Sequence, residues 1–184
     1  YGAERRGAPI FAYVRADRSP IFERGIIRCP DLVLVADETL VPTPAAGVLD
    51  GIDEHTVMVI TGAVDEDEWH RRLSIAGRLV VVPLPNEEDL AERRHVGVRL
   101  AALAARMTGA ISLAALEGAV AEELASHGAM VIEENLAHAR AAWDMAAAYE
   151  GVVAGARVLT AVDYAAPGWV DLEAESTALS APVV

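Results

Sequence analysis

The first half of the chain alternates short apolar runs, rich in β-branched residues, with polar loops. Such runs predict buried strands. The four runs are Pro9–Val14, Leu32–Ala36, Thr56–Ile60 and Leu79–Val82. The last three contain almost no polar alternation, which is typical of strands covered by helices on both faces. We therefore expect a mainly parallel sheet in an α/β layered fold.

The segments between these runs predict turns and short helices. The polar set at 15–20 favours a turn, with a hairpin or an antiparallel edge strand around it. Pro44–Asp50 can form one short helix. Asp65–Leu73 can form another, because Asp65 is a good N-cap and the acidic residues that follow suit the helix dipole. The same acidic run could attract a divalent cation, but a helix start is the simpler interpretation.

The pattern changes near Asn86, and from about Arg93 it is helical and rich in alanine. Gly109 is expected to end the first helix in a left-handed conformation, and Ser112 is expected to cap the second. The many alanines at contact positions predict closely packed helices rather than a roomy pocket. Apolar positions at helical spacing predict three helices, Val98–Thr108, Ile111–Leu124 and Val131–Ala148.

The last stretch, 151–184, loses this periodicity and gathers proline, glycine and scattered acids. We interpret it as an extended tail. Its apolar side chains, among them Tyr164, Trp169 and Leu172, are more numerous than in a typical disordered linker, so we predict that the tail docks on a partner subunit. The predicted organisation is one α/β domain over 1–150, followed by this docking tail over 151–184.

The amino-acid composition excludes several kinds of catalytic and metal site. The 184 residues are 53% hydrophobic and 23% charged, with a formal net charge of -13, and all 15 basic residues are arginine. Without lysine, Schiff-base catalysis and a P-loop are excluded. The one cysteine, Cys29, cannot form an intramolecular disulfide or by itself hold a zinc or iron–sulfur centre. Any redox metal is therefore expected in a partner.

Charge and hydropathy also limit the partners and the compartment. An acidic chain without a basic stripe is a poor fit to nucleic acid. Apolar stretches are broken well before the roughly 18 residues of a membrane span, and no signal-peptide pattern is present. We therefore expect a cytoplasmic protein. The start at Tyr1 rather than methionine suggests that an upstream part has been processed, split off or left out.

Few side chains are spaced for catalysis or metal binding. Among the five histidines, His138 lies one helical turn after Glu134, a spacing that could chelate a metal, although a solvent-facing pair is the preferred interpretation. No Gly-x-Ser-x-Gly elbow or Gly-x-Gly-x-x-Gly loop occurs. The chain lacks a self-contained catalytic set, which favours an accessory subunit.

The opening segment is the stretch richest in functional groups. Its glycines allow close backbone approach, and its arginines can hold a carboxylate or phosphate. We expect an interface or a loop near an active site here; a solvated N-terminal arm is the alternative. The residues concerned are Tyr1, Gly2, Glu4, Arg5, Arg6 and Gly7.

Three blocks of the sequence are distinctive when taken together: the opening Tyr1–Pro9, the strand, turn and Pro-Ile step that ends at Ile21, and the Pro30–Leu40 segment. Followed by the predicted helices, they resemble the gamma subunit or gamma domain of the 2-oxoacid:acceptor (ferredoxin) oxidoreductases, the family that includes pyruvate:ferredoxin oxidoreductase. The family's usual first strand and glycine loop, which precede the first block, are not present ahead of Tyr1.

This resemblance implies a Rossmann-like three-layer domain with a mostly parallel sheet, C-terminal helices and the extended tail. It implies oxidative decarboxylation of a 2-oxoacid, usually with coenzyme A as acyl acceptor. Thiamine diphosphate, magnesium and [4Fe-4S] clusters are then expected on alpha, beta and delta-type partner subunits, and no catalytic or metal-ligating residue is expected on this chain. The alternative is a stand-alone α/β module that binds a nucleotide or coenzyme A.

Overall fold

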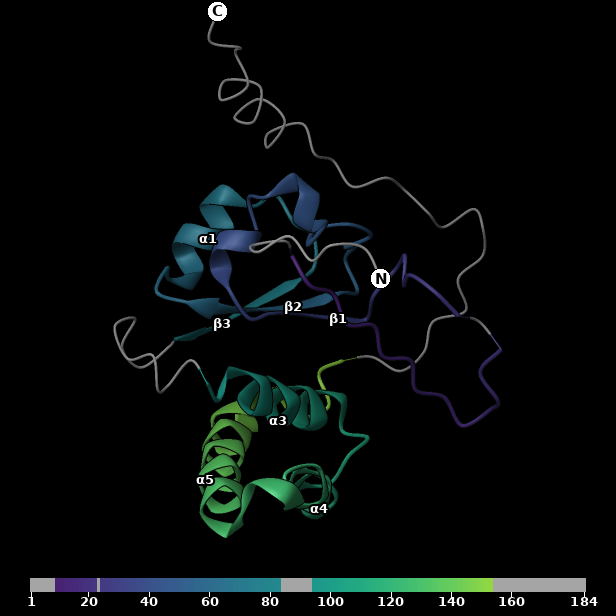
Figure 1. Cartoon of the computed structure of the whole chain (residues 1–184). Helices are drawn as coiled ribbons and strands as arrows, with labels where there is room; N and C mark the ends of the chain where they lie inside the picture. Colours follow the sequence, from purple (N-terminus) through teal and green to yellow (C-terminus); the bar gives the residue numbers. More distant parts are fainter. Residues whose placement is uncertain (1–8, 23, 84–93, 154–184) are drawn as a thin grey trace, which may run out of the picture.

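A computed structural model describes residues 9–22, 24–83 and 94–153 of the chain. Its strands are β1 (Leu32–Val35), β2 (Val57–Gly62) and β3 (Arg78–Pro83). Its helices are α1 (Glu66–Arg72), α3 (Val96–Thr108), α4 (Leu113–Glu123) and α5 (Ala129–Met145). Short 3-10 helices span Glu38–Leu40, Pro44–Ala46, Ala125–His127 and Ala146–Tyr149. The three strands all precede α3, α4 and α5 along the chain, and these three helices form the helical layer (Figure 1).

The three strands form one parallel sheet in the order β1-β2-β3, with β2 in the centre. Leu32 pairs with Val57, and Met58 pairs with Leu79. Every residue of β2 is buried, which suits a strand covered on both faces and rich in β-branched side chains. The parallel sheet predicted from the second, third and fourth apolar runs is therefore confirmed.

Alternating side chains of β2 enter two separate hydrophobic clusters, one on each face of the sheet. Met58 belongs to the cluster that contains Trp69 of α1. Val59 belongs to the other cluster, together with Leu103 and Met107 of α3. Figure 1 shows α1 on one side of the sheet and α3, α4 and α5 on the other. The predicted three-layer α/β fold is confirmed.

Small side chains allow close packing in the helical layer, as predicted. Helix α5 packs along α3, and α4 contacts both. Arg140 of α5 also reaches α4, where its Nε donates to Glu117 at 2.6 Å. Hydrogen bonds to Glu117 and then Glu133 raise the pKa of the Arg140 guanidinium above its ordinary value. The alanines buried in the helical layer are Ala102, Ala105, Ala139 and Ala142.

The predicted helix caps are present. The Asp65 side chain accepts a hydrogen bond from the Glu68 N–H at 2.7 Å, and Ser112 accepts one from the Ala115 N–H at 3.2 Å. Gly109 ends α3 at a φ of 64°, in the left-handed region that favours glycine. These local contacts set where α1 and α4 begin and where α3 ends.

Replacing Asp65 with alanine is expected to lower the free energy of unfolding by about 1 kcal/mol, because the Glu68 N–H loses its cap. Denaturant unfolding measures this change. Asp67→Ala is the matched control, since it removes the same charge from the first turn of α1, next to the N-cap, without removing the cap. Equal losses in the two variants would show that helix-dipole electrostatics, and not the cap, accounts for the effect.

The prediction of a buried strand at Pro9–Val14 is wrong. Within the described residues this segment pairs with no strand, and its side chains face solvent: Ile10 is 88% exposed and Val14 is 82% exposed. An apolar run becomes a strand only where a neighbouring strand pairs with it. The Ser19 N–H donates to Asp17 at 2.6 Å and forms the predicted turn, but no hairpin surrounds it.

Of two further predictions, one is corrected by the structure and the other concerns a segment that lies mostly outside the described residues. The helix predicted at Pro44–Asp50 is only the 3-10 helix Pro44–Ala46, because Gly47 leaves the helical conformation at a φ of 50°. The docking tail predicted at 151–184 lies outside the described residues from 154 onward. Among the helices described, none combines the length and the apolar character needed to cross a bilayer.

Candidate functional site

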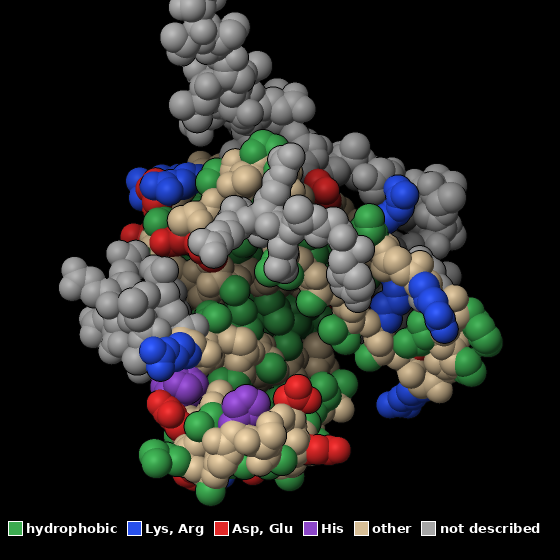
Figure 2. All heavy atoms as spheres, in the orientation of Figure 1, with side chains coloured by type: hydrophobic (Ala, Val, Ile, Leu, Met, Phe, Trp, Pro, Cys, Tyr) green, Lys and Arg blue, Asp and Glu red, His purple; other side chains and the backbone are tan. Residues whose placement is uncertain are grey.

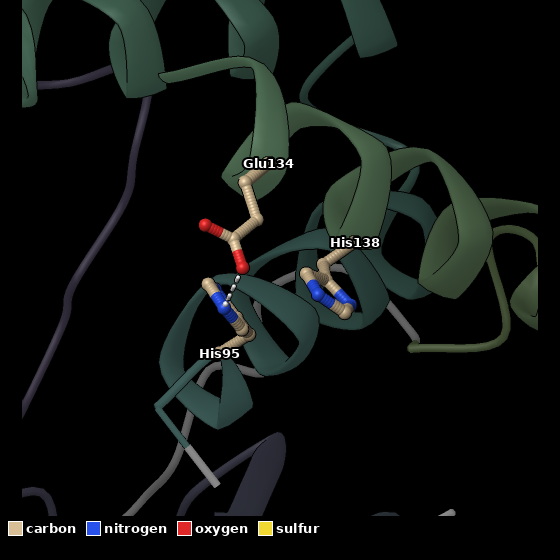
Figure 3. Close-up of side chains that lie close together, drawn as sticks. All are labelled: His95, Glu134 and His138. Atoms are coloured by element: carbon tan, nitrogen blue, oxygen red, sulfur yellow. Dashed lines mark ion pairs between the residues drawn. The ribbon is translucent and has the colours of Figure 1, made fainter. Parts of the chain in front are cut away.

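Three side chains that can ligate a metal, His95, Glu134 and His138, meet on the helical layer (Figure 3). His95 Nε2 lies 3.3 Å from Glu134 Oε1. The two imidazole rings stack with their centroids 4.1 Å apart and their planes 17° from parallel. One ligand atom from each residue lies within 4.8 Å of the other two.

Helix geometry accounts for this cluster. Glu134 and His138 are four residues apart on α5, so they project from the same face of that helix. His95 directly precedes α3, which packs along α5 and brings the His95 ring to this face. The spacing of Glu134 and His138 is visible in the sequence. His95 stands far from both along the chain, and only helix packing brings it to them.

Asn135 orients the His95 ring. Its Nδ2 donates to the Val131 carbonyl at 2.8 Å, which leaves Oδ1 to face His95 Nδ1 at 3.3 Å. Because Oδ1 can only accept, Nδ1 carries a proton, and a neutral His95 turns the Nε2 lone pair toward Glu134. Two acceptors that face each other at 3.3 Å favour a proton or a metal ion between them.

The cluster is buried on one side and open on the other. The side chain of His95 is 10% exposed, whereas that of Glu134 is 57% exposed. Arg99, one turn into α3, has its NH2 group 3.1 Å from His138 Nδ1. A guanidinium can only donate, so Nδ1 of His138 accepts this hydrogen bond.

The carboxyl edge of the sheet, where α/β folds commonly bind ligands, is occupied by the chain itself. Glu38, which follows β1, accepts hydrogen bonds from the N–H groups of Ala63 and Val64 at 3.0 and 3.2 Å. Gly62 leaves the space for this side chain, since a Cβ there would overlap the Glu38 carboxylate. Glu38 thus holds amides that a phosphate would otherwise use.

The interface residues predicted at the two ends of the chain lie outside the described residues, so they stay predictions. Those of the opening loop are Tyr1, Gly2, Glu4, Arg5, Arg6 and Gly7. Those of the tail are Tyr164, Trp169 and Leu172.

Sequence relatives of this chain are oxidoreductase subunits. The family model described as pyruvate ferredoxin/flavodoxin oxidoreductase matches residues 1–145. The pyruvate synthase subunit PorC of Thermotoga maritima is 31% identical over 121 residues, which cover 64% of this chain and 60% of that protein. The pyruvate/ketoisovalerate oxidoreductases common subunit gamma of Thermococcus kodakarensis is 29% identical over 153 residues, which cover 82% of this chain and 80% of that protein.

The crystal structure of PorC from Thermotoga maritima has a similar fold. It superposes with a TM-score of 0.50 at 20% sequence identity, covering 64% of each chain. The present chain matches about 60% of the length of its Thermotoga relative. The family model covers most of the chain, as the sequence motifs predicted, so the chain belongs to the pyruvate ferredoxin/flavodoxin oxidoreductase family.

Proposed function

We propose that this chain is the gamma subunit of a heteromeric 2-oxoacid:acceptor oxidoreductase and that it serves assembly rather than the chemical step. Family membership over residues 1–145 is the observation that carries this proposal. One relative is named as a subunit of pyruvate synthase, and another as a gamma subunit common to pyruvate and ketoisovalerate oxidoreductases. The proposed reaction is oxidative decarboxylation of a 2-oxoacid, usually to an acyl-CoA.

The residues of this chain do not fit the cofactors of that reaction. A [4Fe-4S] cluster takes about four thiolate ligands, and the chain has the single cysteine Cys29. A diphosphate at the carboxyl edge of the sheet would have to displace Glu38 from its two backbone N–H donors. We therefore place thiamine diphosphate, magnesium and the iron–sulfur clusters on alpha, beta and delta-type partner subunits, where coenzyme A would also react.

The alternative, a stand-alone module that binds a nucleotide or coenzyme A, is opposed by the same edge of the sheet. Beyond Glu38, α1 begins with Glu66, Asp67 and Glu68 in its first turn. These carboxylates suit the helix dipole but repel a phosphate group. Both features that would recognise a phosphate, free amides and a helix N-terminus, are taken by acidic side chains.

The segment 9–31, which we call the arm, supports a role in assembly. In Figure 1 it is the purple stretch that loops away from the sheet, and Figure 2 shows hydrophobic and arginine side chains on that side of the molecule. Large exposed apolar patches mark interaction sites, and protein interfaces are rich in aromatic residues and arginine. The exposed apolar side chains of the arm are Ile10, Phe11, Tyr13, Val14, Ile21, Phe22 and Ile26.

We infer that the two ends of the chain extend this contact. The arm continues directly from the opening loop, so Arg5 and Arg6 would lie at the same partner surface and offer their guanidinium groups to its carboxylates. The tail would add the apolar side chains of Tyr164, Trp169 and Leu172 as anchors. The subunit would then hold its partners through segments outside its folded core.

Co-expression with the alpha, beta and delta-type subunits tests the proposal. A tagged wild-type chain is expected to recover the partners together with thiamine and iron. The double variant Ile10→Ser/Phe22→Ser is expected to recover at least about tenfold less of them, because side chains at the centre of an interface carry most of its binding energy. Its melting temperature is expected to stay unchanged, since both side chains face solvent.

The matched control is Met130→Ser/Met145→Ser, which removes two exposed apolar side chains from α5. It is expected to recover the partners as the wild type does. If both double variants recover the partners equally well, the role of the arm is contradicted, but the proposed function is not. A wild-type chain that purifies by itself, without thiamine or iron, would contradict the proposed function as a whole.

A further inference from the structure

We propose that His95, Glu134 and His138 bind a divalent transition-metal ion, with Zn²⁺ as the best fit, and that this ion joins the start of α3 to α5. Imidazole nitrogen and carboxylate oxygen are both good zinc ligands. Two histidines and one glutamate supply three ligands and leave the fourth position to water. The ion would tie together two helices that are separated in the chain by α4.

The observed spacing suits a tetrahedral ion. With Zn–N and Zn–O bonds of about 2.0–2.1 Å, two ligand atoms at the tetrahedral angle lie about 3.3 Å apart. His95 Nε2 and Glu134 Oε1 are 3.3 Å apart. One ligand atom of His138 lies within 4.8 Å of one from each of the other two residues. Because the two imidazole rings stack 17° from parallel, the His138 ring has to turn out of the stack to direct its lone pair at the same ion. Figure 3 shows His95 and Glu134 facing each other, with His138 beside them.

A neighbouring side chain already holds His95 as a ligand. Metal-binding histidines nearly always donate their other ring N–H to an oxygen, which fixes the tautomer and the ring orientation. Asn135 Oδ1 provides this acceptor at His95 Nδ1, and its own amide group is fixed by the Val131 carbonyl. The Nε2 lone pair of a nearly buried histidine is therefore directed at a carboxylate before any ion is bound.

Arg99 competes with the metal. Its guanidinium donates to His138 Nδ1, which places the proton of a neutral ring on Nε2. Metal binding at Nε2 moves that proton to Nδ1, where it faces the guanidinium, so Arg99 has to turn away. Its positive charge also repels the ion. Removing the guanidinium is therefore expected to tighten metal binding.

A second glutamate–histidine pair, on α1, has the same spacing but, among the described residues, lacks a third ligand. Glu66 and His70 on α1 have the same four-residue spacing, with His70 Nε2 3.7 Å from Glu66 Oε1, and both side chains are exposed. Such a pair can supply only two ligands to a metal ion. The pair on α1 is therefore a matched control within the same chain.

The experiment is a titration of the full-length chain, expressed without partner subunits and stripped of metal by a chelator, with Zn²⁺ in competition with a chromophoric chelator. We expect one tight site per chain, together with a rise in melting temperature on saturation. Glu134→Gln and His138→Gln are each expected to weaken this site at least about tenfold. The Glu134 side chain is exposed and that of His138 is half-buried, and circular dichroism verifies that the variants fold. His70→Gln is expected to leave the site unchanged.

Variants of two neighbouring residues test whether the surroundings of the three ligands support metal binding. Asn135→Ala is expected to weaken Zn²⁺ binding by about 10–100-fold, because the His95 ring loses its acceptor. Arg99→Met, which keeps the aliphatic stem, is expected to strengthen it. Co²⁺ bound in place of Zn²⁺ is expected to give the intense visible absorption of tetrahedral coordination.

The proposal is overturned if Zn²⁺ binds no more tightly than it does to the Glu134→Gln variant, or if His70→Gln weakens binding as much as His138→Gln does. A third result also overturns it. If Zn²⁺ does not raise the melting temperature, while Glu134→Gln lowers it only at acidic pH, the cation between His95 and Glu134 is a proton.

Discussion

Replacing Gly51 with alanine is expected to lower the free energy of unfolding by about 2–5 kcal/mol, as measured by denaturant unfolding. Gly51 has a φ of 74°, in the left-handed region where a non-glycine residue costs about 1–2 kcal/mol. A Cβ at this position would also overlap the carbonyl oxygen of Arg28 and lie 2.6 Å from its carbonyl carbon. Backbone atoms cannot rotate out of the way, so the chain itself has to shift.

The location of Gly51 makes this shift costly. The residue is buried in the loop before β2, and Arg28 lies in the segment that leads into β1. The close approach of the two backbones therefore joins the entrances of two paired strands. A displacement there propagates into the pairing of Leu32 with Val57 and into the hydrophobic clusters on both faces.

Gly118→Ala is the matched control. Gly118 lies inside α4, and a Cβ at this position would meet no atom within 4 Å. Alanine is expected to stabilise the helix here by about 0.5–1 kcal/mol, because it loses less conformational freedom than glycine on folding. If Gly51→Ala were as harmless as Gly118→Ala, the close approach of Gly51 to Arg28 would be absent from the folded protein.

The sheet and the helices were predictable because their signals are local. Val57–Ile60 contains only apolar residues and is buried on both faces, so its composition alone indicates a central strand. Asp65 and Ser112 mark helix starts through hydrogen bonds that span only three residues. Such local patterns can be read from the sequence because they do not depend on contacts with distant parts of the chain.

The arm was not predictable in the same way. The run at Pro9–Val14 has the composition of a buried strand, yet Ile10 and Val14 face solvent. A strand needs a pairing partner, and an exposed interface segment needs apolar residues just as a core strand does. Composition therefore cannot tell the two apart. What separates them is whether the surface that covers them belongs to the same chain.

The cluster of His95, Glu134 and His138 was half predictable for a related reason. The four-residue spacing of Glu134 and His138 is a helical pattern that the sequence displays. His95 has no such relation to either residue, and it joins them only because α3 packs along α5. Asn135, adjacent to Glu134, becomes meaningful only once its amide is seen to face His95. Both contributions belong to the tertiary structure.

Replacing Leu103 with alanine is expected to destabilise the protein by about 2–5 kcal/mol, which places it beside Gly51→Ala as the largest effect of a single substitution. Leu103 is 2% exposed and lies in the cluster that joins α3 to β2 and β3. Removing its branched side chain leaves a cavity between layers whose other members are mostly valines and alanines on fixed backbones. Such residues cannot extend into the vacated space.

Met130→Ala is the control for Leu103→Ala, because it also shortens a large apolar side chain on a helix of the same layer, but at a position that is 84% exposed. Its expected effect is within about 0.5 kcal/mol. Denaturant unfolding of both variants compares burial directly. A loss below about 1 kcal/mol for Leu103→Ala would mean that α3 is loosely held against the sheet. The site formed by His95 at the start of α3 would then lack the rigid support that three converging ligands need.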